Sequence, residues 1–126
     1  MARKTVYWVT TGLLAALSAF AAFSYLTGSS QAVQGFMHVG YPQQLRIILG
    51  IAKLLGAIAL VAPGFPKLKE WAYAGFTFAW ISAFVGHYLA KDGAAAYFPL
   101  VLLVFLSISY VTRPPSRRLS AKAVST

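Results

Sequence analysis

The sequence predicts an all-α protein, a four-helix transmembrane bundle, and three observations support this prediction. The chain has 126 residues, of which 59% are hydrophobic and only 10% are charged, whereas soluble domains carry about 25% charged residues. Four apolar stretches are each long enough to cross a hydrocarbon core about 30 Å thick. Clusters of Pro, Gly, Ser and charged residues separate these stretches, as turns between helices would. We therefore expect a single four-span membrane domain over residues 1–113.

The first helix is expected over residues 6–26, which contain no charged side chain. One stripe of this helix holds small residues, which suit contact with another helix. They are Thr11, Ala15, Ser18 and Ala22. A cleavable signal peptide is the alternative, since residues 19–21 resemble a small-x-small cleavage site after a basic start. The apolar run continues beyond that site, which favours a retained helix.

Residues 27–42 are expected to form a loop, because they are rich in Gly, Ser and Gln and end in Gly40-Tyr41-Pro42. The second helix then covers residues 43–62, since proline is tolerated at a helix start. The turn around Pro63 and Gly64 ends it. The remaining two helices are expected over residues 71–90 and 94–111. Residues 114–126 are expected to form a basic, disordered cytoplasmic tail.

The second helix carries two cations, Arg46 and Lys53, on one face together with Gly50, Ala57 and Leu60. A cation exposed to lipid at the bilayer centre is unfavourable by roughly 2.5–3.5 kcal/mol on insertion scales. Small residues mark the places where membrane helices approach closely. Both signals predict that this face points into the protein.

The third helix has two neighbouring stripes. Gly75, Ala79 and Ala83 recur every four residues and predict a close-packing face. Tyr73, Trp80 and His87 recur every seven residues and form an aromatic and polar stripe. This second stripe could line a flat quinone or a lipid, although packing is the commoner role of such a stripe.

The distribution of basic residues predicts the topology. Eight of the eleven Lys and Arg residues fall on one side of the predicted membrane: Arg3, Lys4, Lys67, Lys69, Arg113, Arg117, Arg118 and Lys122. Lys91 alone lies in a loop on the other side. The positive-inside rule then places both termini in the cytoplasm of a bacterial inner-membrane protein. This topology, with attraction to anionic lipid, accounts for the net charge of +9 without nucleic-acid binding.

Lys53 is the most informative candidate, because it lies near the bilayer midplane with no carboxylate at a matching depth. It could bond to carbonyls and hydroxyls such as those of Ser18 and Ser82, lose its proton on burial, or meet an anion, a ligand or a partner subunit. An intramembrane ionisable group is a functional candidate by default. The alternative is a lysine that merely snorkels toward polar groups.

The other polar candidates are less specific. Arg46 and His87 are expected at matched depth, and with Lys53, Trp80 and Tyr73 they make up the predicted ligand-binding set. Glu70 is interpreted as structural, pairing with Lys67, Lys69 or a helix N-terminal amide, and Ser18 and Ser82 as structural polar groups. His38 and His87 could together bind a metal or haem, but His38 lies in the predicted loop, so no metal site is predicted.

Catalytic chemistry has little support in the sequence. The chain lacks cysteine, which excludes disulfides, thiolate metal sites and iron–sulfur clusters held by this chain. No nucleophile–base pair, metal cluster or nucleotide motif is visible. No catalytic residue is therefore predicted.

Several sequence elements together resemble the DoxX-like family of small bacterial membrane proteins. They are Gly40-Tyr41-Pro42, the stretch from Leu49 to Leu60 around Lys53, Pro63, and the run from Leu68 to Phe76. The resemblance covers most of residues 6–113 and implies a four-helix membrane bundle with an accessory role in membrane redox complexes linked to quinones and sulfur compounds. It supports Lys53, Glu70 and His87 as family-pattern positions. Gly86 stands before His87 where a serine is more usual, so no serine–histidine pair is expected.

Two functions follow as hypotheses. The first is a non-catalytic accessory or ligand-binding subunit for a quinone, lipid or anion, working in a membrane redox complex with a redox partner or as a homo-oligomer. The alternative is a small oligomeric transporter of an anionic or lipid-like solute. A proton-coupled exporter of cations fits poorly, because such exporters need a carboxylate inside the membrane and the intramembrane charges here are positive.

Overall fold

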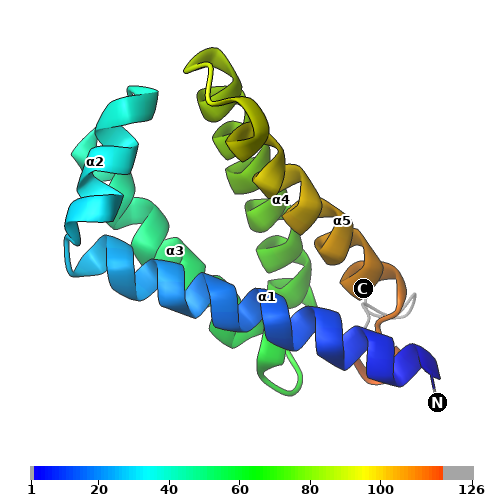
Figure 1. Ribbon diagram of the computed structural model, residues 1–126. Helices are drawn as coiled ribbons and strands as arrows, with labels where there is room; N and C mark the ends of the chain where they lie inside the picture. Colours follow the sequence, from blue (N-terminus) through cyan, green and yellow to red (C-terminus); the bar gives the residue numbers. More distant parts are fainter. Residues whose placement is uncertain (1, 118–126) are drawn as a thin grey trace.

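The computed structural model describes residues 2–117, and within them every regular element is helical (Figure 1). The elements are α1 (Ala2–Leu26), α2 (Ser30–Val39), α3 (Gln43–Val61), α4 (Pro66–Leu89), η1 (Gly93–Tyr97), α5 (Phe98–Val111) and η2 (Pro115–Arg117), where η marks a 3₁₀ helix. The all-α prediction is confirmed, with five α-helices in the described part where four were expected.

The four longer α-helices pack in a closed order. α1 lies along α3 and against α5, α3 packs against α4, and α4 packs against α5 (Figure 1). A hydrogen bond from the Arg3 guanidinium to the Val111 carbonyl, 2.7 Å long, holds the start of α1 beside the end of α5. We call this the terminal end of the bundle. α2 and the turn between α4 and η1 lie at the opposite end, which we call the α2 end.

Three helical segments are long and apolar enough to cross a membrane: Ala2–Leu26, Gln43–Val61 and Gly93–Val111. α4 has 24 residues but is not among them, since its uncharged stretch 71–89 is diluted by residues of low hydropathy such as Trp71, Tyr73 and His87. Large apolar side chains on the outer faces of the helices are exposed, including Phe20, Phe23, Leu55, Phe78 and Val104. Such a surface fits lipid rather than water, so the chain is a membrane protein.

The core combines apolar packing with a short chain of hydroxyls. Buried apolar side chains come from all four long helices: Leu14, Leu60, Tyr73, Phe76, Trp80, Leu102 and Leu106. Ser109 on α5 shares hydrogen bonds with Thr11 on α1 (2.5 Å) and with Tyr73 on α4 (2.7 Å). The small stripe predicted for the first helix is buried, as expected for a face that contacts other helices.

The prediction of a loop over residues 27–42 was wrong, because α2 occupies most of that segment. The hydroxyl of Ser29 accepts a hydrogen bond from the backbone N–H of Ala32 (3.2 Å), which caps the start of α2. Gly40 ends α2 in the left-handed region at φ 81°. Ala32 and Phe36 form its buried face. The residues that suggested a loop are therefore the caps and the exposed face of a short helix.

The predicted close-packing face of the third helix was also wrong at Gly75, which is exposed. The buried face of α4 instead carries Tyr73, Phe76 and Trp80. The close approach is made by a glycine on α3: a Cβ built on Gly56 would lie 2.8 Å from Phe76 Cζ. The prediction placed the small residues of this contact on α4. In the structure, α3 supplies the small residue and α4 supplies the bulky rings.

Candidate functional site

Lys53 lies near the middle of α3 and points into the bundle, with only 8% of its surface exposed. Its Nζ atom is 5.7 Å from the ring centroid of Tyr25 on α1 and 5.6 Å from that of Trp80 on α4. Ammonium groups within about 6 Å of an aromatic face are attracted by the ring quadrupole. Two helices therefore supply aromatic faces to one cation carried by a third.

Among residues 2–117 the Lys53 ammonium makes no hydrogen bond to an acceptor, and its Nζ atom is not fully closed off as the Ser18 hydroxyl is. The two hydroxyls considered from the sequence do not supply one. Ser18 is buried, and its hydroxyl has no hydrogen-bond partner within the described chain. Ser82 is exposed, and it is its backbone carbonyl that is engaged, by the Tyr41 hydroxyl at 2.7 Å. A buried donor without an acceptor is unfavourable by about 1–3 kcal/mol.

A groove between α3 and α4 leads to Lys53. Its volume is about 230 Å³, and small side chains make room for it. The residues lining it are Leu49, Ala52, Lys53, Gly56, Trp71, Ala72, Gly75, Phe76 and Ala79. Trp71 and Phe76 are its aromatic lining residues, and Phe76 is stacked on Trp80, with ring centroids 5.0 Å apart. We call this cavity the Lys53 groove.

Arg46 is engaged with the end of α1. Its Nε donates to the Gln43 side chain at 2.8 Å, and its guanidinium also donates to the backbone carbonyl of Tyr25. Basic side chains commonly satisfy carbonyls at a helix C-terminus. Arg46 therefore fixes the residue whose ring faces Lys53, and acts on the site through Tyr25.

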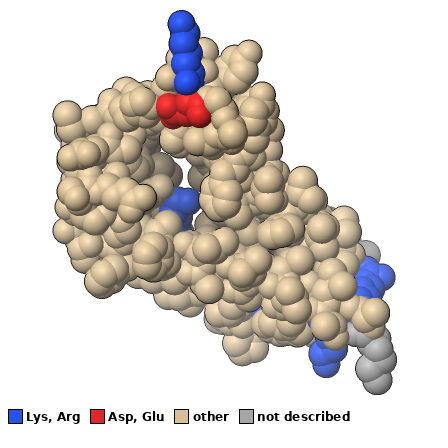
Figure 2. Space-filling model, in the orientation of Figure 1, with Lys and Arg blue, Asp and Glu red and all other residues tan. Residues whose placement is uncertain are grey.

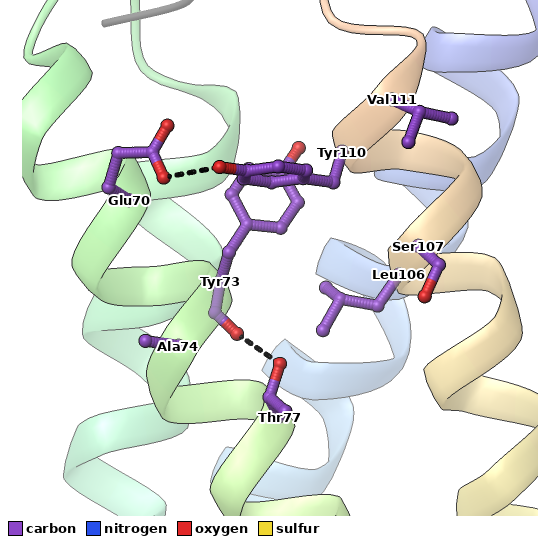
Figure 3. A pocket seen from close by; sticks show the side chains of 8 residues that line it. All are labelled: Glu70, Tyr73, Ala74, Thr77, Leu106, Ser107, Tyr110 and Val111. Atoms are coloured by element: carbon purple, nitrogen blue, oxygen red, sulfur yellow. Dashed lines mark hydrogen bonds between the residues drawn. The ribbon is translucent and has the colours of Figure 1, made fainter.

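Tyr73 and Glu70 lie at a different cavity, between α4 and α5 near the terminal end (Figure 3). Its volume is about 410 Å³. The Glu70 carboxylate accepts a hydrogen bond from the Tyr110 hydroxyl at 2.9 Å and forms an ion pair with Arg113. The prediction that Glu70 pairs with Lys67 or Lys69 was wrong: Lys69 turns toward the α3–α4 turn and donates to the carbonyls of Ala62 and Gly64.

His87 lies at the α2 end, in a cluster with His38 and Asp92. The Nδ1 of His87 donates to one Asp92 oxygen at 2.6 Å, and the Nε2 of His38 donates to the other at 2.5 Å. These two hydrogen bonds, first that from His87, lower the pKa of Asp92 from its ordinary value. The two imidazoles approach different oxygens, and within residues 2–117 no group of three or more His, Cys, Asp or Glu side chains could hold a metal ion.

The model of the DoxX-like family matches residues 9–109, which is most of the chain. This chain belongs to the DoxX-like family. No curated protein and no solved structure matches it.

The DoxX-like match spans the Lys53 groove, Glu70 and His87, but the structure separates the predicted ligand set into three places. Lys53 and Trp80 lie together, Tyr73 lines the α4–α5 cavity, and His87 lies at the α2 end. A seven-residue repeat keeps side chains on one face of a helix while moving them about 10 Å along its axis. One stripe of α4 therefore serves three different environments.

Two residues of the candidate sites in this DoxX-like protein were not predicted from the sequence. Tyr25 faces Lys53 from α1, and Asp92 joins the two histidines. The depth argument that matched Arg46 with His87 could have found Tyr25, since it lies at the same end of its own helix. Asp92 follows Lys91 in the predicted loop, but its contact with His38 depends on α2 being helical.

Arg117 belongs to the bundle and not to the predicted tail. Its side chain is buried; it donates to the Tyr7 hydroxyl (2.7 Å) and to the backbone carbonyls of Leu60 (2.7 Å) and Ala62 (3.0 Å). Residues 114–117 thus contribute to the fold through η2. The rest of the predicted tail, 118–126, lies outside the described residues.

Proposed function

We propose that this DoxX-like protein is a non-catalytic membrane protein that binds a lipid-dissolved ligand of the quinone class in the Lys53 groove. One observation carries the proposal: Lys53 presents a buried ammonium with no acceptor in the described chain, at the wall of an open groove. A ligand carbonyl would supply the missing acceptor. Hydrogen bonds that involve a charged group contribute about 1.5–3 kcal/mol.

The depth of Lys53 favours a quinone over a phospholipid or a soluble anion. Lys53 lies near the middle of the 19-residue helix α3, roughly 12–15 Å from either end at 1.5 Å per residue. Phospholipid headgroups stay in the interfacial region of the bilayer. A quinone ring can enter the hydrocarbon core, and Trp71 and Phe76, which line the groove, offer it aromatic surface.

We further propose that α4 also crosses the membrane, giving four spans in a bacterial inner membrane with both termini cytoplasmic. The described basic residues of the terminal end, from Arg3 and Lys4 to Arg117, support this orientation through the positive-inside rule. An accessory role in a redox complex, or as a homo-oligomer, is carried by the family context alone. The transporter alternative has only the positive charge of Lys53 in its favour.

Native mass spectrometry of the detergent-extracted protein tests the ligand. The probes are ubiquinone-2 and dioleoylphosphatidylglycerol, added to wild type, Lys53→Met and, as a matched control, Lys67→Met at an exposed lysine. We expect a quinone adduct on wild type and Lys67→Met, and a loss of about tenfold or more in affinity for Lys53→Met. Equal quinone binding by Lys53→Met would contradict the proposal, as would Lys53-dependent binding of the phospholipid alone.

A further inference from the structure

α2 and the loop after it form a bridge across the α2 end, which we call the strap (residues 29–42). Its near end is fixed to α1 and α3: the hydroxyls of Ser24 and Ser29 share a hydrogen bond of 2.6 Å, and the Gln43 amide donates to the Val33 carbonyl at 3.1 Å. These contacts attach the strap to α1 and to α3, the helix that carries Lys53.

The inner face of the strap covers the aromatic ring beside Lys53. Phe36 meets Tyr25 edge to face, with ring centroids 5.1 Å apart and planes at 90°. Tyr25 presents its ring to Lys53 Nζ. Phe36 thus supports the Tyr25 ring edge to face, and that ring in turn faces the ammonium, so a displacement of α2 would remove the support of the ring that faces Lys53.

The far end of the strap is held to α4 by two polar links. His38, whose side chain is 55% exposed, donates to Asp92, and Asp92 is held in turn by His87. The Tyr41 hydroxyl donates to the Ser82 carbonyl at 2.7 Å. The same hydroxyl lies against Gly86, where an added Cβ would be 3.0 Å from the Tyr41 oxygen. The neighbouring Lys91 is exposed. Polar links at an exposed rim can open without disturbing the buried core.

The surface beneath these links is hollowed. Figure 2 shows a hollow between the limb of α2 and α3 and the limb of α4, η1 and α5, with acidic atoms at its rim and atoms of a basic side chain visible inside. The space beneath the strap is thus open between the two limbs, and the links between α2 and the turn after α4 close it at the α2 end.

We infer that the strap gates access from the aqueous phase at the α2 end to the Lys53 site, and that the His38–Asp92 and Tyr41–Ser82 contacts hold it shut. The identity of the ligand that would pass the gate rests on the proposed function, whereas the gate itself rests on the contacts of the strap. When both contacts are broken, α2 loses its hold on α4, the Phe36–Tyr25 pair is released, and water reaches Lys53.

The chain has no cysteine, so one introduced thiol reports on the gate without background. The reporter is Lys53→Cys in proteoliposomes, and the probe is a methanethiosulfonate reagent with a trimethylammonium group, which cannot enter through lipid. Its reaction rate is compared in the reporter alone, with Asp92→Ala and Tyr41→Phe added, and with Lys91→Gln added as the matched control. N-ethylmaleimide, which is neutral and lipid-permeable, normalises the reactivity of the thiol.

We expect the charged reagent to react at least tenfold faster in the Asp92→Ala, Tyr41→Phe background than in the reporter alone or with Lys91→Gln. Equal rates in all backgrounds would overturn the gate. Should this double change prevent folding, His38→Ala with Tyr41→Phe gives the same comparison, since it breaks both links while Asp92 stays paired with His87. The labelling experiment is done without quinone, so its result is independent of whether the protein binds quinone.

Discussion

Lys53 and Lys69 are both buried lysines, but their ammonium groups are in opposite situations. Lys69 donates to the carbonyls of Ala62 and Gly64 at the end of α3, where the negative end of the helix dipole also favours a cation. Lys53 has two aromatic faces and no acceptor in the described chain. The first arrangement serves the fold. The second leaves donor capacity unused, which is what a binding site requires.

Replacing each lysine by methionine should therefore have opposite effects on stability. Lys53→Met is expected to stabilise the ligand-free protein by about 1 kcal/mol, because a largely desolvated ammonium with no hydrogen-bond acceptor in the described chain is replaced by an apolar side chain. Lys69→Met is expected to destabilise it by about 1.5–3 kcal/mol, because at least the Gly64 carbonyl loses a charged donor. Thermal unfolding in detergent, after delipidation, measures both. A destabilised Lys53→Met would mean that Lys53 belongs to an internal polar network.

We expect the stability of the strap to depend on pH through the protonation of Asp92. Its pKa in the folded protein is lowered from the model-compound value of 3.8, because His87 and His38 donate hydrogen bonds to the carboxylate. A lowered pKa contributes stability that is fully present above the unfolded value and is lost as pH falls through the folded value. We expect hydrogen exchange of α2 to quicken as pH falls below about 4 in wild type, after correction for intrinsic exchange. In Asp92→Asn, exchange should already be fast, and the corrected rate should not change across this window.

The α3–α4 contact shows how one small residue can set both packing and a cavity. Gly56 lets the Phe76 ring lie against the α3 backbone, and both residues line the Lys53 groove. Gly75 lines the same groove from α4, but a Cβ there would meet nothing within 4 Å. The two glycines therefore provide a matched pair on facing helices.

Substitution by alanine should separate these roles. Gly75→Ala is expected to be neutral or stabilising by up to about 1 kcal/mol, since alanine is the better helix former. Gly56→Ala is expected to destabilise by about 1–3 kcal/mol, because the new Cβ would force the buried Phe76 ring to shift. Thermal unfolding measures the difference between the two variants. If both changes had the same effect, the close approach at Gly56 would not limit the packing.

The elements differ in how far the sequence could predict them. The inward face of α3 followed from the position of two cations among small residues, and it is buried at Gly50, Lys53 and Ala57. α2 could not be found in this way, because a ten-residue helix is specified by Ser29 and Gly40 at its ends as much as by periodicity. The partners of Lys53 depend on which helices are neighbours, and a pattern within one helix does not contain that information.

Across the whole molecule, charge is distributed between two ends with different roles. At the terminal end, Arg117 joins α1 to the end of α3, and Arg113 pairs with Glu70. These basic groups hold helix ends together, and in the proposed topology they lie on the cytoplasmic side. At the α2 end, the exposed Lys91 stands beside Asp92, whose charge offsets it. The same asymmetry thus supports the proposed topology and the position of the strap.

Single-cysteine labelling in intact bacteria tests that topology, because the chain has no cysteine of its own. Lys91→Cys and Lys67→Cys both replace exposed lysines, one at each end of α4. We expect a membrane-impermeant maleimide to label Lys91→Cys in intact cells with a permeable outer membrane, and Lys67→Cys only after the inner membrane is disrupted. The reverse pattern would invert the orientation and place the strap in the cytoplasm. Labelling of both in intact cells would mean that α4 does not cross the membrane, leaving three spans and a Lys53 groove that opens at the surface.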